Sequence, residues 1–458
     1  MNTSPYIFTK ILKPVINVLR NRGFLSTIYL DDIFCIGKNF KLCKKNIIES
    51  RKLLEDVGFI LNTEKSFLIP SQRCKFLGFI FDSVKYSIEL PVKKKDQLKD
   101  LISKFVIGVS YKIRDFAVLL GVLNSCCPAV AYGFVHCKNL EREKFLALIA
   151  TDGDYDRHMI IKSKLSKNLN WWKINSQIGI NPIRTSKYAL EISSDASLTG
   201  WDAYCNGKSA NGWWNDKEKQ YHINYLELVG AFLALKCFVK KLHDCEILLR
   251  LDNTTAIAYV NKAGGIQYPV LTNLAKQIWD WCESKRILVF ASYISSKQNV
   301  YADAASRITN IDTEWELCEE AFEKIIKKFG SFTIDLFATY SNKKVKKFCS
   351  RFPNPDVFKV DAFTISWTNE KSYAFPPFAL VLPTLKKFIN DKAEGILVVP
   401  NSTWPTQPWF PLFNSLLRGS SIIFKPSKKL LLSPCREITH PLAKTLSLVA
   451  GRLSGKHF

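Results

Sequence analysis

The sequence predicts a multi-domain chain that combines α/β and α+β units. The chain is 458 residues long and 47% of its residues are apolar, which provides for several packed cores and suggests three or four units. Between residues 188 and 308, alternating and continuous apolar runs predict the element order βββαβααβα. We find no internal repeat and no low-complexity tract, so the fold class rests on these observations.

The charge of the chain points to a polyanionic partner. Lys and Arg number 65 against 41 Asp and Glu, which gives a formal net charge of +24 at pH 7. A basic surface that serves only solubility is the alternative. An excess of this size favours nucleic acid as the partner.

Cysteine usage and hydropathy indicate an intracellular, reducing compartment. The 13 cysteines are scattered and form no Cys-x-x-Cys pair, which argues against disulfides and against a zinc site. No apolar run is long enough to span a membrane, and the first residues lack the apolar core of a signal peptide. We therefore expect no membrane partner and leave nucleus and cytoplasm undecided.

The first predicted element that carries candidate metal-binding residues is a tight hairpin. Residues 24–37 read as two apolar strands with Asp31 and Asp32 at the tip between them. Two adjacent carboxylates held on such a tip favour a bound divalent metal. Taken alone, the pair fits an ordinary turn equally well.

Three further elements follow the hairpin. A helix is predicted over residues 41–57, with apolar residues on one stripe and Gly58 at its end. A short strand is predicted over residues 59–62. A second compact apolar strand is predicted over residues 76–81.

This succession resembles the palm of a reverse transcriptase from its catalytic hairpin onward. The resemblance implies that Asp31 and Asp32 bind a divalent metal and take part in catalysis, and that Lys65 acts on the incoming nucleotide. It is more similar to the DIRS-like group of retrotransposons than to the Gypsy-like group. The segments that carry it are Ser4-Pro5 with Ile7-Phe8-Thr9-Lys10, Tyr29-Leu30-Asp31-Asp32, Gly58-Phe59-Ile60-Leu61-Asn62-Thr63-Glu64-Lys65-Ser66, and the primer-grip-like Phe76-Leu77-Gly78.

The polymerase motifs are incomplete in comparison with that family. A polymerase of this kind needs a third carboxylate on a strand well before the hairpin, and fingers that hold template and nucleotide. None of the 30 residues before Asp31 is an aspartate or glutamate. We therefore expect an N-terminally truncated open reading frame that starts inside the palm and does not extend a primer alone.

Residues 91–180 correspond to thumb and connection in the same comparison. Basic residues crowd into the first part of this stretch, which suits a helix that lies along a phosphate backbone. A solvated helix face explains any single lysine equally well. The polar stretch over residues 175–186 predicts a linker. The predicted nucleic-acid-binding lysines of the chain are Lys65, Lys93, Lys94, Lys95 and Lys99.

The next stretch supplies the βββαβααβα order. Short apolar runs separated by Gly and Asn predict the strands, and longer amphipathic runs predict the helices. The predicted elements are strands over 188–194, 201–206 and 209–214, a helix over 224–243, a strand over 246–252, helices over 254–262 and 269–286, a strand over 287–294 and a last helix at Asp303.

Four acidic residues stand beside apolar runs in four of these elements. They are Asp195, Glu227, Asp252 and Asp303. Carboxylates at the ends of adjacent elements make an oxygen-only site, which hard divalent cations prefer. Mg²⁺ is the expected cofactor and Mn²⁺ the alternative. Four solvated surface acids would not explain why each lies at an element end.

The order of elements and the four acids resemble ribonuclease H in the version fused to reverse transcriptases. The resemblance implies two-metal hydrolysis of the RNA strand of an RNA–DNA hybrid. Such enzymes commonly carry a histidine ten residues before the last aspartate, where this chain has Tyr293, so turnover is in doubt but metal binding is not. The matching motifs are Ser194-Asp195-Ala196-Ser197, Tyr225-Leu226-Glu227-Leu228, Leu251-Asp252-Asn253-Thr254 and Asn299-Val300-Tyr301-Ala302-Asp303.

The last part of the chain, residues 311–458, predicts an α/β unit. A helix over 314–329 precedes Asp335-Leu336-Phe337-Ala338 and Pro376-Pro377-Phe378, which loosely resemble an adenine-type methyltransferase. The glycine-rich turn of that fold is missing, and Phe375 stands where a polar residue is needed. We expect a degenerate, inactive relic of that fold, or a structural unit similar to it.

These expectations combine into one functional prediction and one alternative. The leading prediction is a retroelement-derived reverse transcriptase with ribonuclease H activity and an incomplete RNA-directed DNA polymerase. The alternative is a catalytically silent, basic nucleic-acid-binding remnant of a retrotransposon. The oligomeric state stays open. The predicted domains are a partial palm over 1–90, a thumb and connection over 91–180, a ribonuclease H domain over 186–308 and the methyltransferase-like unit over 311–458.

Overall fold

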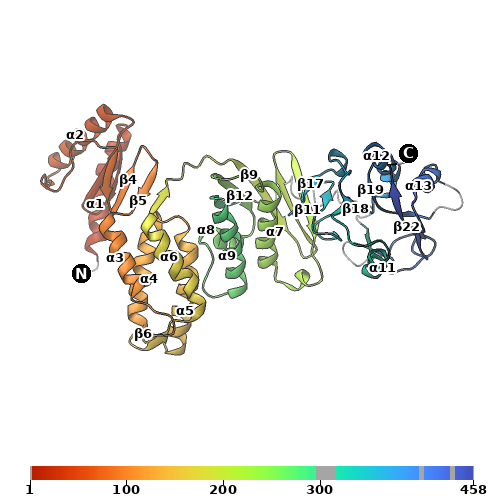
Figure 1. Cartoon of the computed structure of the whole chain (residues 1–458). Coiled ribbons are helices and arrows are strands. Elements are labelled where there is room, and N and C mark those ends of the chain that lie inside the picture. Colours follow the sequence, from red (N-terminus) through yellow and green to blue (C-terminus); the bar gives the residue numbers. More distant parts are fainter. Residues whose placement is uncertain (1–2, 296–314, 402–406, 434–438, 457–458) are drawn as a thin grey trace. The chain divides into compact units, whose positions relative to one another are not determined.

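The chain folds into two compact units, Met1–Thr185 and Ser186–Phe458. The computed structural model describes residues 3–295, 315–401, 407–433 and 439–456 (Figure 1). Both units mix helices with strands, which confirms the predicted mixture of α and β structure. Within the described residues, no helix combines the length and the apolar character that a bilayer crossing requires.

The N-terminal unit begins with a hairpin between two helices. The two strands pair antiparallel, α1 packs against β1, and α2 packs against β2. The buried side chain of Asn46 joins α2 to both strands, because its Nδ2 donates to the carbonyl oxygens of Leu25 (2.8 Å) and Ile36 (3.0 Å). The elements are α1 (Ser4–Asn21), β1 (Leu25–Tyr29), β2 (Asp32–Ile36) and α2 (Phe40–Asp56).

A small antiparallel sheet and a helical bundle complete this unit. The sheet has the order β3-β4-β5-β8, and the helices enclose an apolar core that contains Phe116, Leu140 and Trp172. The elements are β3 (Arg73–Phe76), β4 (Phe79–Asp82), β5 (Ser87–Glu89), α3 (Val92–Ser103), β6 (Ser110–Lys112), α4 (Ile113–Cys126), α5 (Gly133–Ala150), β7 (His158–Ile160), α6 (Ser166–Ile178) and β8 (Ile180–Pro182).

Three sequence predictions for this unit are wrong. Residues 59–62 form no strand, because no neighbouring strand pairs with them. The single strand over 76–81 is the turn of a hairpin, in which Leu77 and Gly78 adopt positive φ angles of 48° and 77°. The expected linker over 175–186 is largely structured, since α6 extends to Ile178 and β8 joins the sheet.

The C-terminal unit starts with a five-stranded mixed sheet in the order β11-β10-β9-β12-β13. The first three strands are antiparallel, and β12 runs parallel to both β9 and β13. Helix α7 packs on β9 and β10, and α8 packs on β13. The elements are β9 (Leu190–Ala196), β10 (Gly200–Cys205), β11 (Lys208–Trp213), α7 (Ile223–Phe238), β12 (Glu246–Leu251), α8 (Thr254–Asn261), α9 (Pro269–Ser284) and β13 (Leu288–Tyr293).

This sheet confirms the predicted order of strands and helices through residue 293. One boundary is wrong, because α7 ends at Phe238 and not at residue 243. The chain turns back after Val239 and passes through Asp244, whose φ is 53°, to enter β12. The predicted last helix at Asp303 lies outside the described residues.

A second sheet follows in the same unit, in the order β15-β18-β19-β22-β20. Strands β15, β18 and β19 are parallel, and β22 is antiparallel to both of its neighbours. The predicted helix over 314–329 is shorter, because Glu316 and Leu317 pair with β21 before the helix begins. The elements are β14 (Glu316–Leu317), α11 (Glu319–Phe329), β15 (Ile334–Asp335), β16 (Cys349–Ser350), β17 (Lys359–Val360), β18 (Lys371–Ala374), α12 (Val381–Asn390), β19 (Glu394–Pro400), α13 (Phe410–Leu416), β20 (Ile422–Phe424), β21 (Leu431–Leu432) and β22 (Leu448–Ser454).

Strand β19 shows why this sheet is covered on both faces. Its side chains alternate, and all four central ones are buried and apolar. Leu397 and Val399 join the core formed with α12 and α13, whereas Ile396 and Val398 join the core formed with α11. The result is an α/β unit with helices on either side of the sheet.

Candidate metal centre

Two of the predicted acids lie at one edge of the first sheet of the C-terminal unit. Asp195 is near the end of β9, and Asp252 directly follows β12. The two strands are parallel neighbours, with Arg250 opposite Ser193. Because the carboxyl ends of parallel strands meet at the same edge of a sheet, the side chains of Asp195 and Asp252 are brought together.

Helix α7 supplies the third acid, Glu227. The imidazole of His222 caps the helix, since its Nδ1 accepts a hydrogen bond from the backbone N–H of Asn224 (3.2 Å). Gly230 lies about one turn beyond Glu227. A Cβ atom at Gly230 would stand only 3.4 Å from Cβ of Trp201 and 3.5 Å from the carbonyl oxygen of Asp195. These are ordinary contact distances, so α7 lies close to the strands that it covers and leaves room at Gly230 for little more than a methyl group.

The three carboxylates form one cluster. One oxygen each from Asp195, Glu227 and Asp252 lies within 4.8 Å of the others. Glu227 is buried, and the two aspartates are half-buried. Burial, together with the charges of Asp195 and Asp252, raises the pKa of Glu227 to about 8, although a hydrogen bond from the backbone of Ala196 opposes this shift.

This donor set fits a hard divalent cation. Three carboxylates so close together repel one another, and burial of Glu227 strengthens the repulsion. The cluster is therefore favourable either when Glu227 holds a proton or when a cation replaces that proton. Oxygen-only ligands of this kind suit Mg²⁺ and Mn²⁺.

Two asparagines that the sequence reasoning did not single out join the supporting helices. The side chain of Asn253 caps α8, because its Oδ1 accepts from the backbone N–H of Ala256 (2.9 Å). Its Nδ2 donates to Oδ1 of Asn224 (3.0 Å), in the first turn of α7. This bond ties the residue after Asp252 to the helix that carries Glu227. An Asn directly before the predicted helix over 254–262 was the available sequence signal.

Of the two other residues predicted for this centre, the structure describes Tyr293 but not Asp303. Tyr293 ends β13 and pairs with Leu251, the residue before Asp252. This register places Tyr293 at the same edge of the sheet as the carboxylates, and the residue is 59% exposed there. Asp303, the fourth predicted acid, lies outside the described residues.

The aspartate pair of the N-terminal unit is exposed at its hairpin. Tyr29 pairs with Asp32, so the loop of the hairpin is Leu30 and Asp31, and Leu30 adopts a φ of 53°. Both aspartates are exposed. Among the described residues, no third acidic, histidine or cysteine side chain joins them in a metal-sized cluster.

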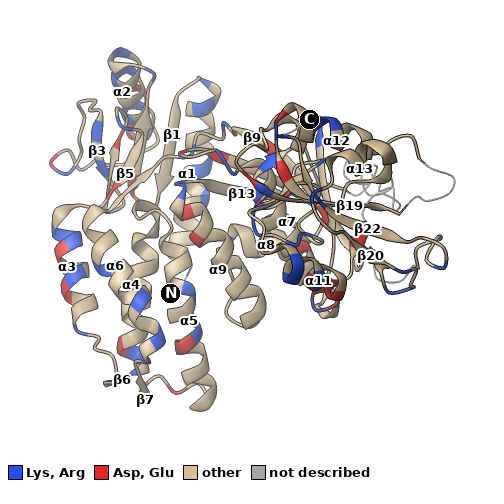
Figure 2. Cartoon of the chain, turned by 45° about the vertical axis from the view of Figure 1, so that its right-hand side comes forward, with Lys and Arg blue, Asp and Glu red and all other residues tan. Residues whose placement is uncertain are grey.

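The predicted nucleic-acid-binding lysines divide into exposed and engaged ones. Lys65, Lys93 and Lys99 are exposed. The ammonium of Lys94 lies 4.6 Å from the ring centre of Phe79. Lys95 donates to the carbonyl oxygens of residues 177 (3.0 Å) and 178 (2.6 Å), and so caps the end of α6. Basic and acidic residues share α3 (Figure 2), so the helix is not uniformly basic.

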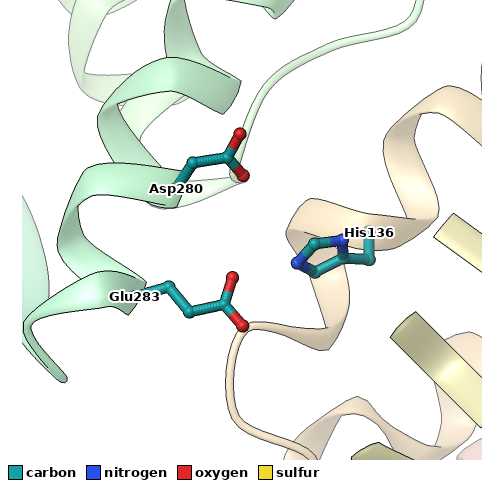
Figure 3. A group of neighbouring side chains, drawn as sticks. All are labelled: His136, Asp280 and Glu283. Atoms are coloured by element: carbon teal, nitrogen blue, oxygen red, sulfur yellow. The ribbon is translucent and has the colours of Figure 1, made fainter. Parts of the chain in front are cut away.

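Two further acids project from α9, outside the cluster. Asp280 and Glu283 lie one turn apart on that helix (Figure 3), and Asp280 pairs with Lys276 at 2.6 Å. His136 belongs to α5 of the N-terminal unit, where its ring stacks on Trp171 with the ring centres 3.8 Å apart. Each of these contacts lies within one unit, and we assign the three residues no common site.

Asp335 of the methyltransferase-like motif is buried, and its side chain forms hydrogen bonds with the backbone of the loop that follows it. Its carboxylate accepts hydrogen bonds from the backbone N–H groups of Lys344 (3.0 Å) and Phe337 (3.3 Å), while burial raises its pKa to about 6. The ring of Phe337 packs against Phe363 and Trp367. None of the comparisons reported below supports the predicted methyltransferase relic.

Comparison with known proteins identifies one segment. Residues 1–81 match the family model of the reverse transcriptase (RNA-dependent DNA polymerase). This match agrees with the resemblance of the hairpin segment. The comparison with curated proteins gives no match.

Solved structures with distant similarity include two viral complexes and one free-standing nuclease. The foamy viral protease-reverse transcriptase with dsDNA is 17% identical, with a TM-score of 0.34, and the match covers 64% of this chain and 59% of that chain. The same viral protein with an RNA/DNA hybrid is 18% identical (TM-score 0.33; 63% and 38% covered). RNase H1 from the halophilic archaeon Halobacterium salinarum is 16% identical (TM-score 0.21; 25% and 92% covered). This chain thus spans 59% of the first viral chain.

Proposed function

We propose that this chain is a retroelement-derived reverse transcriptase and ribonuclease H, of the DIRS-like group, that hydrolyses the RNA strand of RNA–DNA hybrids. The observation that carries the proposal is the convergence of Asp195, Glu227 and Asp252 within 4.8 Å of one another. The reverse transcriptase match of residues 1–81 supports the family to which such a nuclease would be fused.

The residues of the cluster have distinct tasks in this proposal. Asp195 and Asp252, at adjacent strand ends, hold the divalent ions, and Glu227 loses its proton to complete the site. Asp303 is proposed as the fourth ligand. Mg²⁺ held by these carboxylates would supply an activated water at neutral pH and would stabilise the leaving oxygen of the cleaved phosphodiester. The bond between Asn253 and Asn224 keeps the two supporting helices in register.

The substrate class follows from charge and from the reaction. The net charge of +24 suits a polyanion, and the 2′-hydroxyls of the RNA strand distinguish a hybrid from DNA. Asp31 and Asp32 are proposed as metal ligands of the polymerase part. For residues 311–458 we propose a structural or binding role and no methyl transfer, because Asp335 is occupied by its own loop. Tight binding of S-adenosylmethionine by the chain would contradict this last point.

Cleavage of a labelled RNA–DNA hybrid by the purified chain with Mg²⁺ tests the proposal. Asp195→Asn is expected to lower the rate at least about 100-fold, because even the loss of outer partners of metal ligands commonly costs 10- to 100-fold. Asp216→Asn, an exposed aspartate outside the cluster, is the matched control and should retain the rate. Binding of the hybrid should survive both changes.

The same experiment separates the proposal from its alternative. A folded chain that binds hybrid in a salt-sensitive way but never cleaves it would favour a catalytically silent nucleic-acid-binding remnant. Tyr293 would then be the first residue to examine, because it stands at the carboxylate edge of the sheet where related nucleases have a histidine.

A further inference from the structure

A basic and aromatic surface lies on the C-terminal unit, away from the carboxylate cluster in sequence. Between residues 340 and 360 the chain has six Lys and Arg residues and one acidic residue, Asp356. The segment includes β16 and β17, which pair in parallel with Cys349 opposite Lys359. The bridge between Phe348 and Asp335 connects it to the edge of the second sheet.

Some of these basic residues have structural tasks. Lys344 is buried and donates to Glu316 and Glu319, both at 2.8 Å. The ammonium of Lys343 lies 3.8 Å from the ring centre of Tyr340, and burial lowers the pKa of Lys343. The remaining basic side chains lie at the surface, and Lys347 among them also pairs with Glu370. The exposed basic residues are Lys346, Arg351 and Lys359.

Two phenylalanines are exposed among these cations. Phe352 is 48% exposed and Phe358 is 51% exposed. The guanidinium of Arg351 lies 5.1 Å from the ring centre of Phe352. The ammonium of Lys347 lies 4.2 Å from the ring centre of Phe358. Each exposed ring thus lies beside a cation, with Phe352 shortly after β16 and Phe358 directly before β17.

Backbone hydrogen bonds hold the two rings on one framework. The N–H of Phe358 donates to the carbonyl of Phe348 (2.9 Å), and the N–H of Asp361 donates to the carbonyl of Ser350 (2.8 Å). Phe348 and Ser350 are themselves buried. The exposed rings therefore project from a packed ladder, and such a rigid presentation reduces the entropy lost when a ligand binds.

We propose that this β16–β17 patch binds single-stranded nucleic acid. Exposed rings offer faces on which unpaired bases stack, and the neighbouring cations contact the phosphates. A duplex hides the faces of its bases, so it could use only the cations of the patch. The patch consists of Lys346, Lys347, Arg351, Phe352, Phe358 and Lys359.

The proposal for this patch is independent of the proposed nuclease activity, so either one can be wrong without the other. The patch binds a strand without cleaving it, and none of its residues belongs to the carboxylate cluster. It would hold unpaired RNA or DNA alike, because stacking and phosphate contacts are shared by both.

Binding of labelled 20-nucleotide strands to the full chain tests the proposal, with EDTA present so that no probe is cleaved. Oligo(dT), oligo(U) and a DNA duplex of equal length are compared by fluorescence anisotropy. The double variant Phe352→Ala/Phe358→Ala should bind both single strands at least about 30-fold more weakly, since each lost stacking contact costs about fivefold or more. Duplex binding should change less than about twofold.

Charge variants provide an independent readout. Arg351→Ala and Lys359→Ala should each reduce the slope of log affinity against log salt by about 0.7 on single strands. Leu442→Ala removes a side chain that is 52% exposed in the same unit, and Lys428→Ala removes an exposed charge; neither should change binding.

Two results would overturn the proposal. One is unchanged single-strand affinity of the folded Phe352→Ala/Phe358→Ala chain, with folding verified by its thermal transition. The other is an equal loss of affinity for duplex and single strands, which would mean that the rings recognise no unpaired bases. Hybrid cleavage by the same variant, measured with Mg²⁺, reports on the nuclease and distinguishes a failed patch from a failed active site.

Discussion

Glu227 is the residue whose protonation makes the stability of the fold depend on pH. In the unfolded chain the pKa of Glu227 is near its ordinary value of 4.5, whereas in the folded chain burial and the charges of Asp195 and Asp252 raise this pKa to about 8. The folded state therefore binds more protons than the unfolded state between these values. In the absence of metal, the free energy of unfolding must fall as the pH rises through this window.

We predict that Glu227→Gln removes this loss. The variant cannot ionise, so with EDTA it should raise the free energy of unfolding at pH 8.5 by on the order of 1–3 kcal/mol and change it little at pH 5. Urea denaturation of the unit Ser186–Phe458 within the full chain measures this, with Asp216→Asn as control. An equal gain at both pH values would show that burial of Glu227 has no electrostatic cost.

At the scale of elements, the contact of α7 with the sheet determines where Glu227 stands. Gly230 lies inside α7, and a Cβ atom there would meet Trp201 and the backbone of Asp195 at ordinary contact distances of 3.4 and 3.5 Å. A methyl group fits this space, but a branched side chain would press against the strand that carries Asp195.

We predict that Gly230→Ala stabilises the chain by about 0.5–1 kcal/mol, because Ala is the better helix former in a helix interior. Gly230→Val should instead destabilise the chain by about 1–3 kcal/mol through overpacking. Thermal unfolding measures both. Hybrid cleavage should persist in the Ala variant and fall in the Val variant. If Gly230→Ala destabilised the chain instead, the space between α7 and the strands beside it would be too small for a methyl group.

The elements also show what the sequence could and could not predict. The alternation of Ile247, Leu249 and Leu251 predicts β12 correctly, because a half-buried strand has period two. The strand predicted at residues 59–62 fails because apolar runs pair only where a neighbouring strand is free, which the sequence does not reveal.

The candidate site divides in the same way. Convergence of Asp195 and Asp252 follows from strand order and is predictable. The hydrogen bond between Asn253 and Asn224 is not, because it joins two helix starts that are 29 residues apart in sequence. The exposure of Phe352 and Phe358 is equally unpredictable from the sequence, since an apolar residue in a sequence is normally assigned to a core.

At the scale of the molecule, the two units have separate cores, and a short exposed segment of the chain joins one to the next. β8 ends at Pro182 and β9 begins at Leu190, and the residues from Arg184 to Lys187 between them are exposed. Segments of this kind are the preferred sites of proteolysis. Arg184 and Lys187 are also the two residues here after which trypsin cleaves.

We predict that limited trypsin digestion cuts early at Arg184 or Lys187 and leaves each unit folded. Because all three clustered carboxylates belong to Ser186–Phe458, hybrid cleavage should remain with the C-terminal fragment after the two are separated. Mass spectrometry locates the cut, and the double variant Arg184→Gln/Lys187→Gln should resist it. Loss of cleavage activity on separation would mean that the N-terminal unit contributes to catalysis. Early cuts within α4 or β12 would contradict the compactness of the units, because those elements are buried in the two cores.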